Sequence, residues 1–444
     1  MRPSCQVGCP PGPSVPSVTG CSPTRSARRP PTSASGRCDG APRSTLGPST
    51  DPDVRSTVRT APPRESDFTS RLRSPAVASR VGVALGVCFA LAFVTGVVSH
   101  WAQAQTWWIP YPTAPAWGYR VTQGLHTLSG IACIPLLLVK LWTVFPRLFQ
   151  AMARPTTRTG LLQLLERASI AVLVAAAIFQ LVTGLANAAQ WYPWGFGFIV
   201  THYAMAWVAI GALLVHVAVK LPVIRAALGA DVESGALDRP GTAPRSAGLT
   251  RRGLLTTTWV AAVVAVLASA GNTVTPLRRV SGLAVRDGEG PQGVPVNKSA
   301  ESAGVTETAR DPGFRFAVVG ADRTVELSRA ELEAMPQTSA TLPIACVEGW
   351  SASGEWSGVR VRDLLDLAGV PAGTDVAVQS LQQGGVYTRT TLQGSFADHP
   401  DTLLALRLNG EDLDIDHGFP CRVIAPNRPG VLQTKWVRSI EVQA

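Results

Sequence analysis

Residues 201–220 read THYAMAWVAIGALLVHVAVK, an apolar run of helical length that carries two histidines. About 20 apolar residues are enough for a helix to cross the hydrocarbon core of a bilayer. On such a helix His202 and His216 lie about 40° apart around the axis and about 21 Å apart along it. The stretch therefore predicts a transmembrane helix with one histidine toward each membrane surface.

Five runs of this kind occur, at 81–99, 121–143, 167–186, 198–219 and 254–271. Lys and Arg gather before the first and fifth runs, after the fourth, and between the second and third. The loops at 101–120 and 187–197 carry only Arg120. Because positive loops stay inside, we expect a multi-pass protein of the cytoplasmic membrane with its C-terminal residues outside.

The net charge of +10 is explained by these loops, and no nucleic-acid-binding motif is present, so we expect no nucleic-acid partner. The eight cysteines include no CxxC pair, which gives no signal for a zinc or iron–sulfur site. Residues 1–75 are rich in Pro, Ser, Thr, Gly and Arg and are expected to form a disordered tail.

His126 lies in the second run at a depth similar to that of His202. The two imidazoles could clamp a b-type haem between neighbouring helices, and Gly124, Gly130 and Gly184 would allow a flat macrocycle or another helix to approach closely. The simpler alternative is a set of interfacial histidines bonded to the backbone. Histidines in several spans favour haem, because ionisable groups in a membrane are usually functional.

Residues 76–225 resemble the membrane cytochrome b subunits of respiratory oxidoreductases, such as the formate dehydrogenase gamma subunit. That family completes an inner haem with a histidine near the cytoplasmic end of the first helix. Here that end reads SRVGVALGVC, residues 79–88, and has none. His216 is therefore a further candidate haem ligand without an evident partner, and the outer haem at His126 and His202 is the firm expectation.

A cytoplasmic linker is expected at 226–250, a fifth transmembrane helix at 251–272, an extracytoplasmic linker at 273–310 and a compact domain at 311–444. The runs FRFAVVG, TDVAVQS, VYTRTTL and CRVIAP alternate as strands do, whereas SRAELEAM and RVRDLLDLAG have helix-start signals. The expected fold is an all-α transmembrane bundle, four cytochrome b-like helices plus a fifth, followed by a mostly β (α+β) domain.

Four segments of this domain, CVEGWSASGEWSGVRVRDLL, LLALRLNGEDL, DHGFPCRVIAP and GVLQTKWVRSIEV, resemble the molybdopterin domain of the sulfite oxidase family, especially its periplasmic methionine sulfoxide reductase branch. The resemblance implies a molybdopterin cofactor whose molybdenum is bound by Cys346, with Glu348 beside it as a catalytic residue. The cofactor contacts that it implies are Asn297, His417, Arg422, Gln433, Thr434 and Lys435. The branch more often has Asn where this chain has His417.

Cys346 has two other interpretations, a packed core thiol and a disulfide with Cys421. An exported domain with two cysteines usually forms a disulfide. Cys421, however, occupies a position that the family fills with an apolar residue, which favours a buried small hydrophobe there. A soft thiolate suits a transition metal, and the metal-ligand interpretation of Cys346 is the one favoured.

The sequence thus predicts a membrane-anchored molybdopterin-dependent oxidoreductase that reduces a sulfoxide or similar small oxo substrate with electrons from quinone through b-type haem. Glu348 would repel a dianion, and Arg389 and His399 are the only basic candidates for a sulfite site. Sulfite oxidation is one alternative, and a haem conduit with a non-catalytic exported domain is another. Arg251-Arg252 before the fifth run resembles a twin-arginine export signal, although positive-inside topology also favours such a pair.

Overall fold

The computed structural model describes residues 63–104, 109–151, 153–244, 248–284 and 290–443. The expected tail at 1–75 lies outside the described residues as far as residue 62. Five helices are long and apolar enough to cross a membrane: α1 (Pro75–Gln103), α2 (Gly118–Val144), α3 (Arg158–Ala188), α4 (Phe198–Gly229) and α5 (Arg251–Ala270). They confirm the predicted helical part of the chain.

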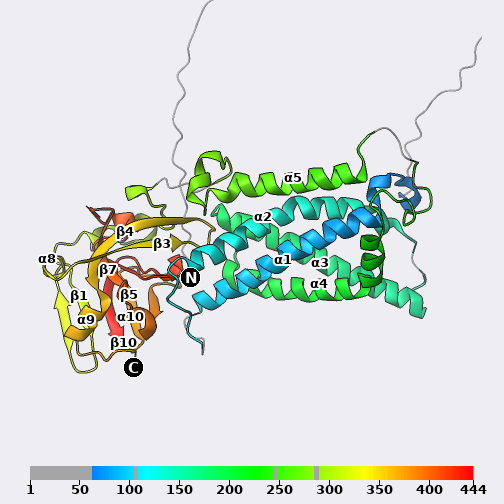
Figure 1. The fold of residues 1–444 in the computed structure, drawn as a ribbon. Coiled ribbons are helices and arrows are strands. Elements are labelled where there is room, and N and C mark those ends of the chain that lie inside the picture. The colour runs from blue at the N-terminus through cyan, green and yellow to red at the C-terminus, as the bar shows by residue number, and fades with distance from the viewer. Residues whose placement is uncertain (1–62, 105–108, 152, 245–247, 285–289, 444) are drawn as a thin grey trace, which may run out of the picture. The chain divides into compact units, whose positions relative to one another are not determined.

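Helices α1 to α4 run side by side, and α5 lies along α2 (Figure 1). Glycines bring the helices close at two places. A Cβ on Gly96 of α1 would lie 3.0 Å from the His126 ring of α2, and a Cβ on Gly124 of α2 would lie 2.6 Å from Thr273, just beyond α5. Gly124 therefore serves the close approach of the segment that follows α5, which fits the second of the two roles suggested by the sequence, a macrocycle or another helix.

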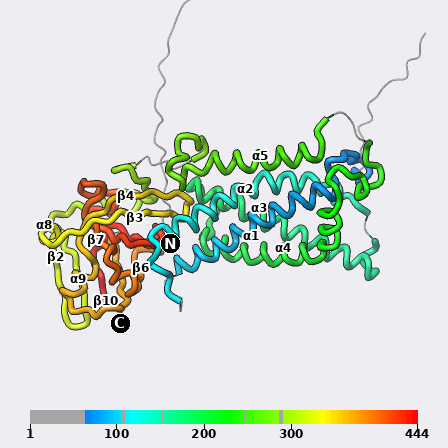
Figure 2. Tube along the Cα trace, in the orientation of Figure 1, coloured from blue at the N-terminus to red at the C-terminus, as the bar shows by residue number. Residues whose placement is uncertain are grey.

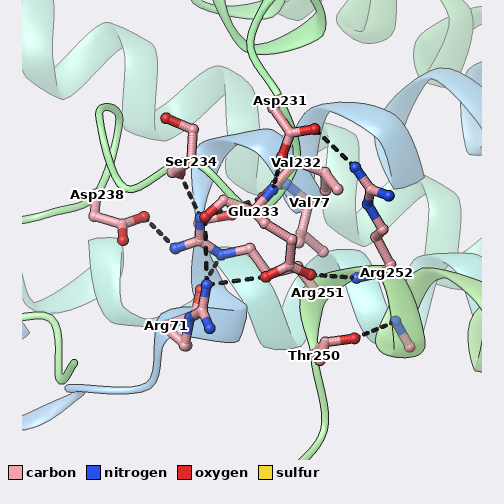
Figure 3. A network of polar contacts seen from close by, with 12 residues as sticks. Arg71, Val77, Asp231, Val232, Glu233, Ser234, Asp238, Thr250, Arg251 and Arg252 are labelled. Carbon is pink, nitrogen blue, oxygen red and sulfur yellow. Dashed lines mark hydrogen bonds and ion pairs between the residues drawn. The ribbon is translucent and has the colours of Figure 1, made fainter. Parts of the chain in front are cut away.

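A polar cluster fastens the start of α5 to the rest of the chain (Figure 3). The Arg251 side chain is fully buried, donates to the carbonyls of Arg71, Val232 and Ser234, and forms an ion pair with Asp238. Thr250 caps the helix by accepting a hydrogen bond from the Gly253 amide. These bonds fix where α5 begins, and Leu254 and Leu255 pack against an apolar cluster in the next turn.

The C-terminal domain contains two five-stranded sheets. The first has the order β2-β1-β10-β5-β6, in which β1 and β10 are parallel and the other pairs antiparallel. The second has the order β3-β4-β7-β8, with β9 also paired to β7. The strands are β1 (Phe316–Val319), β2 (Thr324–Leu327), β3 (Thr338–Ala345), β4 (Ser351–Arg360), β5 (Val376–Ser380), β6 (Arg389–Leu392), β7 (Leu403–Leu408), β8 (Glu411–Asp412), β9 (Arg422–Ile424) and β10 (Val437–Val442).

Five short helices complete the domain: α6 (Ala300–Ala303), α7 (Thr306–Ala309), α8 (Arg329–Ala334), α9 (Val361–Leu367) and α10 (Gly394–Ala397). Ser328 and Glu331 form the capping box that the sequence suggested for α8. The four predicted strand runs contain β1, β5, β6 and β9, and the two predicted helical runs contain α8 and α9. The domain is mostly β, as predicted.

The domain begins earlier than residue 311. Ala300, Ala303, Val305 and Ala309 are buried against Trp436, which lies next to β10. Residues 300–309 are therefore packed into the domain core, because small apolar side chains on α6 and α7 cover the Trp436 ring. The predicted extracytoplasmic linker at 273–310 therefore overlaps the domain over residues 300–309.

Candidate functional site

Cys346 lies in a tight turn that the β3–β4 hairpin produces. The two strands pair from Thr338 and Gly358 to Ala345 and Ser351, which leaves residues 346–350 as the loop. The Cys346 amide donates to the Trp350 carbonyl at 2.9 Å, and the Gly349 amide donates to the Cys346 carbonyl at 3.1 Å. Gly349 has φ +87°, a conformation that glycine adopts without strain. The hairpin thus holds the Cys346 thiol in one position.

The Cys346 side chain lines a small pocket with most of the predicted cofactor contacts. The pocket has a volume of about 10 Å³ and its lining includes Asn297, Cys346, His417, Arg422 and Lys435. These residues come from a loop, the β3–β4 turn, the short helix Ile415–His417, β9 and the segment before β10. Five segments of the sequence therefore meet at one point.

Gly418 allows the segments that carry Arg422 and Lys435 to pack closely around the turn. Gly418 has φ +117°, and a Cβ there would lie 3.1 Å from the Cβ atoms of both Arg422 and Lys435. The Arg422 guanidinium donates to the carbonyls of His417 and Gln433, each at 3.0 Å, and stacks 5.1 Å above the Trp356 ring. The turn and the ring orient the guanidinium, while its buried Nε makes no hydrogen bond among the described residues.

The pocket concentrates positive charge that no carboxylate of the described residues neutralises through an ion pair, although Asp416 lies close enough to act on Lys435 through its charge. In the described part of the chain, Arg422 and Lys435 form no ion pair; Lys435 Nζ donates only to the carbonyls of Lys298 and Asp416, at 2.5 and 2.9 Å. Burial lowers the pKa of Arg422 to about 9 and that of Lys435 to about 7. Unpaired buried cations are costly, so the pocket suits an anionic ligand such as a cofactor phosphate.

His417 and Cys346 complete the pocket with groups that are neutral in this setting. His417 is 2% exposed, and its Nε2 lies 2.7 Å from the Pro291 carbonyl. Burial, followed by the charge of Arg422, lowers the pKa of His417 to about 4. Burial also raises the pKa of the Cys346 thiol. A bound transition metal would reverse this, since coordination deprotonates a thiol.

Three predicted site residues direct their side chains elsewhere. Gln433 exchanges hydrogen bonds with the backbone of Ala425, and the Thr434 hydroxyl lies 2.8 Å from that of Thr390. Glu348 accepts hydrogen bonds from Gln190 Nε2 at 2.7 Å and from the Trp350 indole at 2.9 Å. Gln433 and Thr434 thus fix the backbone around the pocket, and Glu348 faces the end of α3.

Cys346 and Cys421 are both free thiols, so the disulfide alternative is not formed. They lie in separate apolar clusters of the domain core. Cys421 is fully buried and its Sγ donates to the Val437 carbonyl at 3.3 Å. It packs as a small hydrophobe, which leaves the Cys346 thiol available to a ligand.

His126 and His202 face each other in the helical part of the chain. Their ring centroids are 6.3 Å apart and their planes are 74° apart. An imidazole nitrogen lies about 2.0–2.1 Å from a bound metal ion, and each centroid lies roughly 1 Å farther out. Two imidazoles on opposite sides of one metal ion would therefore have centroids roughly 6 Å apart, which matches the observed pair.

Second contacts orient both rings in the same way. Nδ1 of His126 lies 2.8 Å from the Ala92 carbonyl, and Nδ1 of His202 lies 3.0 Å from the Thr183 hydroxyl. Nε2 of neither ring has a hydrogen-bond partner within the described ranges. A metal-binding histidine is usually fixed through its other nitrogen in this manner.

A cavity of about 1580 Å³ surrounds these histidines. Typical ligand pockets are roughly 300–1,000 Å³, so the space is ample for a macrocycle. Gly96, Gly130 and Gly184 are among its lining residues, and so are His100 and His216. His100 stacks on Tyr203 with the ring centroids 3.7 Å apart, and His216 has no second histidine opposite it in the described bundle. The outer pair is the site with ligand geometry.

Sequence reasoning missed several residues that shape the two sites. Arg428 is 4% exposed, donates to the carbonyls of Leu432 and Thr391, and has no carboxylate partner among the described residues. Gln123 and Asn187 connect the bundle to the Cys346 loop by hydrogen bonds to the Val347 carbonyl. A buried arginine in an NRPG turn was a readable signal, whereas the two amides resemble ordinary polar residues near a membrane surface.

Comparison with known proteins concerns mainly the C-terminal domain. Residues 292–444 match the family model described as oxidoreductase molybdopterin binding domain. The chain is 35% identical over 114 residues to a sulfite oxidase of Arabidopsis thaliana, covering 22% of this chain and 29% of that protein. It is 33% identical over 121 residues to the "Uncharacterized oxidoreductase YuiH" of Bacillus subtilis, covering 27% and 60% respectively.

A third relative carries a reductase name. The chain is 35% identical over 112 residues to the "Putative protein-methionine-sulfoxide reductase subunit YedZ1" of Azospira oryzae, covering 25% of this chain and 42% of that protein. The chain thus spans less than two thirds of the length of each of these relatives. The family match itself covers residues 292–444.

Proposed function

We propose that the whole chain is a membrane-anchored enzyme that reduces a small oxo substrate with electrons from the quinone pool, and that residues 292–444, which match the oxidoreductase molybdopterin binding domain and resemble sulfite oxidases, form its catalytic part. The observation that carries the proposal is the pairing of two sites in one chain. One is a thiol pocket with unbalanced buried cations, and the other is a histidine pair with metal-binding geometry.

Cys346 would bind molybdenum, and Arg422 and Lys435 would neutralise the cofactor's phosphate. Arg422 suits this role because its planar fork is held by two carbonyls with Nε left free, and Lys435 acts as a point charge. His417 and Asn297 line the same pocket as neutral polar contacts. When bound, molybdopterin supplies two-electron oxygen-atom transfer and haem supplies one-electron transfer.

Reduction of a neutral substrate is the direction that we favour. Glu348 lies in the same β3–β4 loop as Cys346. Its negative charge would repel an anion such as sulfite. Neither basic candidate for a sulfite site lines the Cys346 pocket: Arg389 pairs with Glu441 at 3.4 Å, and His399 Nδ1 accepts from the Asp401 amide. In the net reaction a sulfoxide loses its oxygen as water on taking two electrons and two protons, and quinol gives up both to become quinone.

His126 and His202 would hold a b-type haem, since each ring is fixed at Nδ1, which leaves Nε2 for a metal ion, and the ring centroids lie 6.3 Å apart. His216 lines the same cavity farther along α4 and is a candidate ligand for a second haem. Quinone would reach this cavity from the lipid. The proposed haem links the quinone pool to the Cys346 site within one polypeptide.

Membrane anchoring follows from the exposed faces of the five long helices. Large apolar side chains are exposed there, including Val200 at 74% and Leu214 at 64%, and lipid would cover them. The loop charges favour placing the C-terminal domain outside the cytoplasmic membrane. Arg251-Arg252 would then serve in twin-arginine export of a domain that has acquired its cofactor in the cytoplasm.

The testing experiment combines metal analysis and optical spectroscopy on the purified full-length protein from a host that makes molybdopterin. We expect near-stoichiometric molybdenum and a reducible b-type haem spectrum in the wild type. Cys346→Ala should lose molybdenum and lower sulfoxide reduction at least a thousandfold while keeping the haem spectrum. His202→Ala should do the reverse, losing haem and keeping molybdenum.

Two results would overturn the proposal. Folded wild-type protein without molybdenum would make the chain a haem protein with a non-catalytic exported domain. Molybdenum-loaded protein that oxidises sulfite and does not reduce sulfoxides would reverse the direction of the reaction. Both substrates should therefore be offered to the same preparation.

A further inference from the structure

The loop that carries Cys346 rests directly on the helices that carry the histidine pair. The Val347 carbonyl accepts hydrogen bonds from Asn187 of α3 at 2.9 Å and from Gln123 of α2 at 3.3 Å. The tip of the β3–β4 hairpin lies beside the ends of α2 and α5 in Figure 2. One carbonyl, adjacent to the candidate molybdenum ligand, thus joins two transmembrane helices.

Each of these amides lies one helical turn from a residue of the histidine site, either His126 itself or Thr183, which orients His202. Gln123 precedes His126 by three residues, a rise of about 4.5 Å along α2. Asn187 follows Thr183 by four residues, and Thr183 orients His202 through Nδ1. The two helices therefore transmit the position of the histidine pair to the Cys346 loop over a short distance.

The backbone at the loop tip also touches α2. A Cβ on Gly349 would lie 2.8 Å from the Thr127 hydroxyl, and the Gly349 carbonyl accepts from the Thr273 hydroxyl at 3.0 Å. Val347 and Glu348 line the same cavity as His126 and His202. Glycine at 349 thus permits both the turn and the close approach to the residue next to His126.

The amides themselves are held so that their donors face the loop. Ser99 donates to Gln123 Oε1 at 2.9 Å, and the Tyr192 hydroxyl donates to Asn187 Oδ1 at 2.9 Å. With their oxygens engaged in this way, the NH₂ groups of both amides are directed to Val347. This arrangement on two different helices is more specific than a general polar contact.

We propose that Gln123 and Asn187 are positioning residues that fix the Cys346 loop against the histidine-bearing helices, so that electrons delivered at the histidine pair reach the Cys346 site without movement of the domain. The electron-transfer part of this proposal rests on the proposed function, whereas the docking part concerns the chain alone. A fixed contact between the Cys346 loop and these helices is important because it sets the distance between the histidine pair and Cys346.

The test uses the full-length protein with the double substitution Gln123→Met/Asn187→Leu, which removes both donors at similar side-chain size. Sulfoxide reduction is driven either by a quinol, which enters through the bundle, or by reduced methyl viologen, which can reduce the exported domain directly. We expect the quinol-driven rate to fall at least tenfold and the viologen-driven rate to change less than twofold, with the haem spectrum unchanged.

A matched control separates positioning from general adhesion between the domain and the bundle. Asn427→Gly removes a second docking contact, in which Asn427 Oδ1 accepts from the Tyr119 amide at 2.5 Å and Nδ2 donates to the Pro112 carbonyl at 2.8 Å. This control should not lower the ratio of quinol-driven to viologen-driven rates more than twofold. An equal fall of both rates in the double variant, or an unchanged quinol-driven rate, would overturn the proposal.

A second readout needs no cofactor. In protein produced without molybdenum, hydrogen exchange of the 346–351 amides should quicken at least tenfold in Gln123→Met/Asn187→Leu and stay near the wild-type rate in Asn427→Gly. Unchanged exchange in the double variant would contradict the docking role. This measurement stands even if the wild type proves to lack molybdenum, so failure of the docking inference and failure of the proposed function are distinguishable.

Discussion

Two buried arginines in this chain have opposite surroundings. Arg251, at the start of α5, is 0% exposed and donates to three carbonyls and to Asp238. Arg422, on β9, is 4% exposed and donates to two carbonyls, with its Nε unbonded and no carboxylate partner among the described residues. The first cation is balanced by the protein, and the second is not.

The difference separates a structural residue from a ligand-binding one. A buried charge requires compensation. Where the protein supplies it, as around Arg251, the cation joins segments that are distant in sequence (Figure 3). Where the protein does not, as around Arg422 and Lys435, an anion from outside is the natural partner. The distinction can be tested by removing each cation in the cofactor-free protein.

The largest effect on folding is expected for Arg251→Met. The substitution leaves Asp238 and the carbonyls of Val232 and Ser234 without their buried donor, so the free energy of unfolding should fall by about 3–5 kcal/mol. Denaturant unfolding in detergent, followed by tryptophan fluorescence, measures it.

The neighbouring Arg252 provides the matched control. Its side chain is 69% exposed and pairs with Asp231, itself 58% exposed, at 2.8 Å, so Arg252→Met should cost less than about 1 kcal/mol. An export signal, by contrast, would need both arginines. Equal destabilisation by the two substitutions would refute the structural role of Arg251. Loss of export in Arg252→Met, with stability retained, would support the proposed twin-arginine signal.

A smaller effect on folding, with a large effect on ligand, is expected for Arg422→Met. In cofactor-free protein the free energy of unfolding should stay within about 1 kcal/mol of the wild type, because relief of an unneutralised charge offsets the loss of two hydrogen bonds. The molybdenum content of protein made with the cofactor should fall at least tenfold. If Arg422→Met destabilises the cofactor-free protein as much as Arg251→Met does, then Arg422 is a structural cation like Arg251.

The sequence predicted those parts of the molecule that local chemistry determines. The five long helices followed from apolar runs, since a chain in lipid must satisfy its backbone within each segment. The gathering of Cys346, His417, Arg422 and Lys435 in one pocket followed from the order of motifs that resemble a known family. Which functions these residues perform stays a prediction until the variants are measured.

Tertiary contacts were beyond the sequence. Nothing near Gln123 or Asn187 indicates that both meet the Val347 carbonyl, because their partner is more than 150 residues away along the chain. For Gly124 the sequence left open a macrocycle or another helix, and only the structure shows that it adjoins Thr273, just beyond α5. Strand β4 was not recognised, since SASGEWSGVR lacks the run of large β-branched residues that marks a strand.

The smallest effect is a pH dependence that comes from Lys435. Burial, together with the charges of Arg422 and Lys298, lowers its pKa to about 7 in the folded protein, against an ordinary value near 10.5, while Asp416 and Cys346 act in the opposite direction. Between these two values the unfolded chain binds more protons than the folded one, so the stability of the cofactor-free protein should rise with pH. From pH 7 to 8.5 we expect a gain on the order of 1 kcal/mol.

Anion binding should show the reverse trend, because only the charged form of Lys435 attracts a phosphate. The affinity of cofactor-free protein for inorganic pyrophosphate should therefore fall several-fold over the same pH range, and Lys435→Met should flatten both profiles. Parallel pH profiles for Lys435→Met and wild type would mean that Lys435 is neutralised by the protein, as Arg251 is, and would place it with the structural cations.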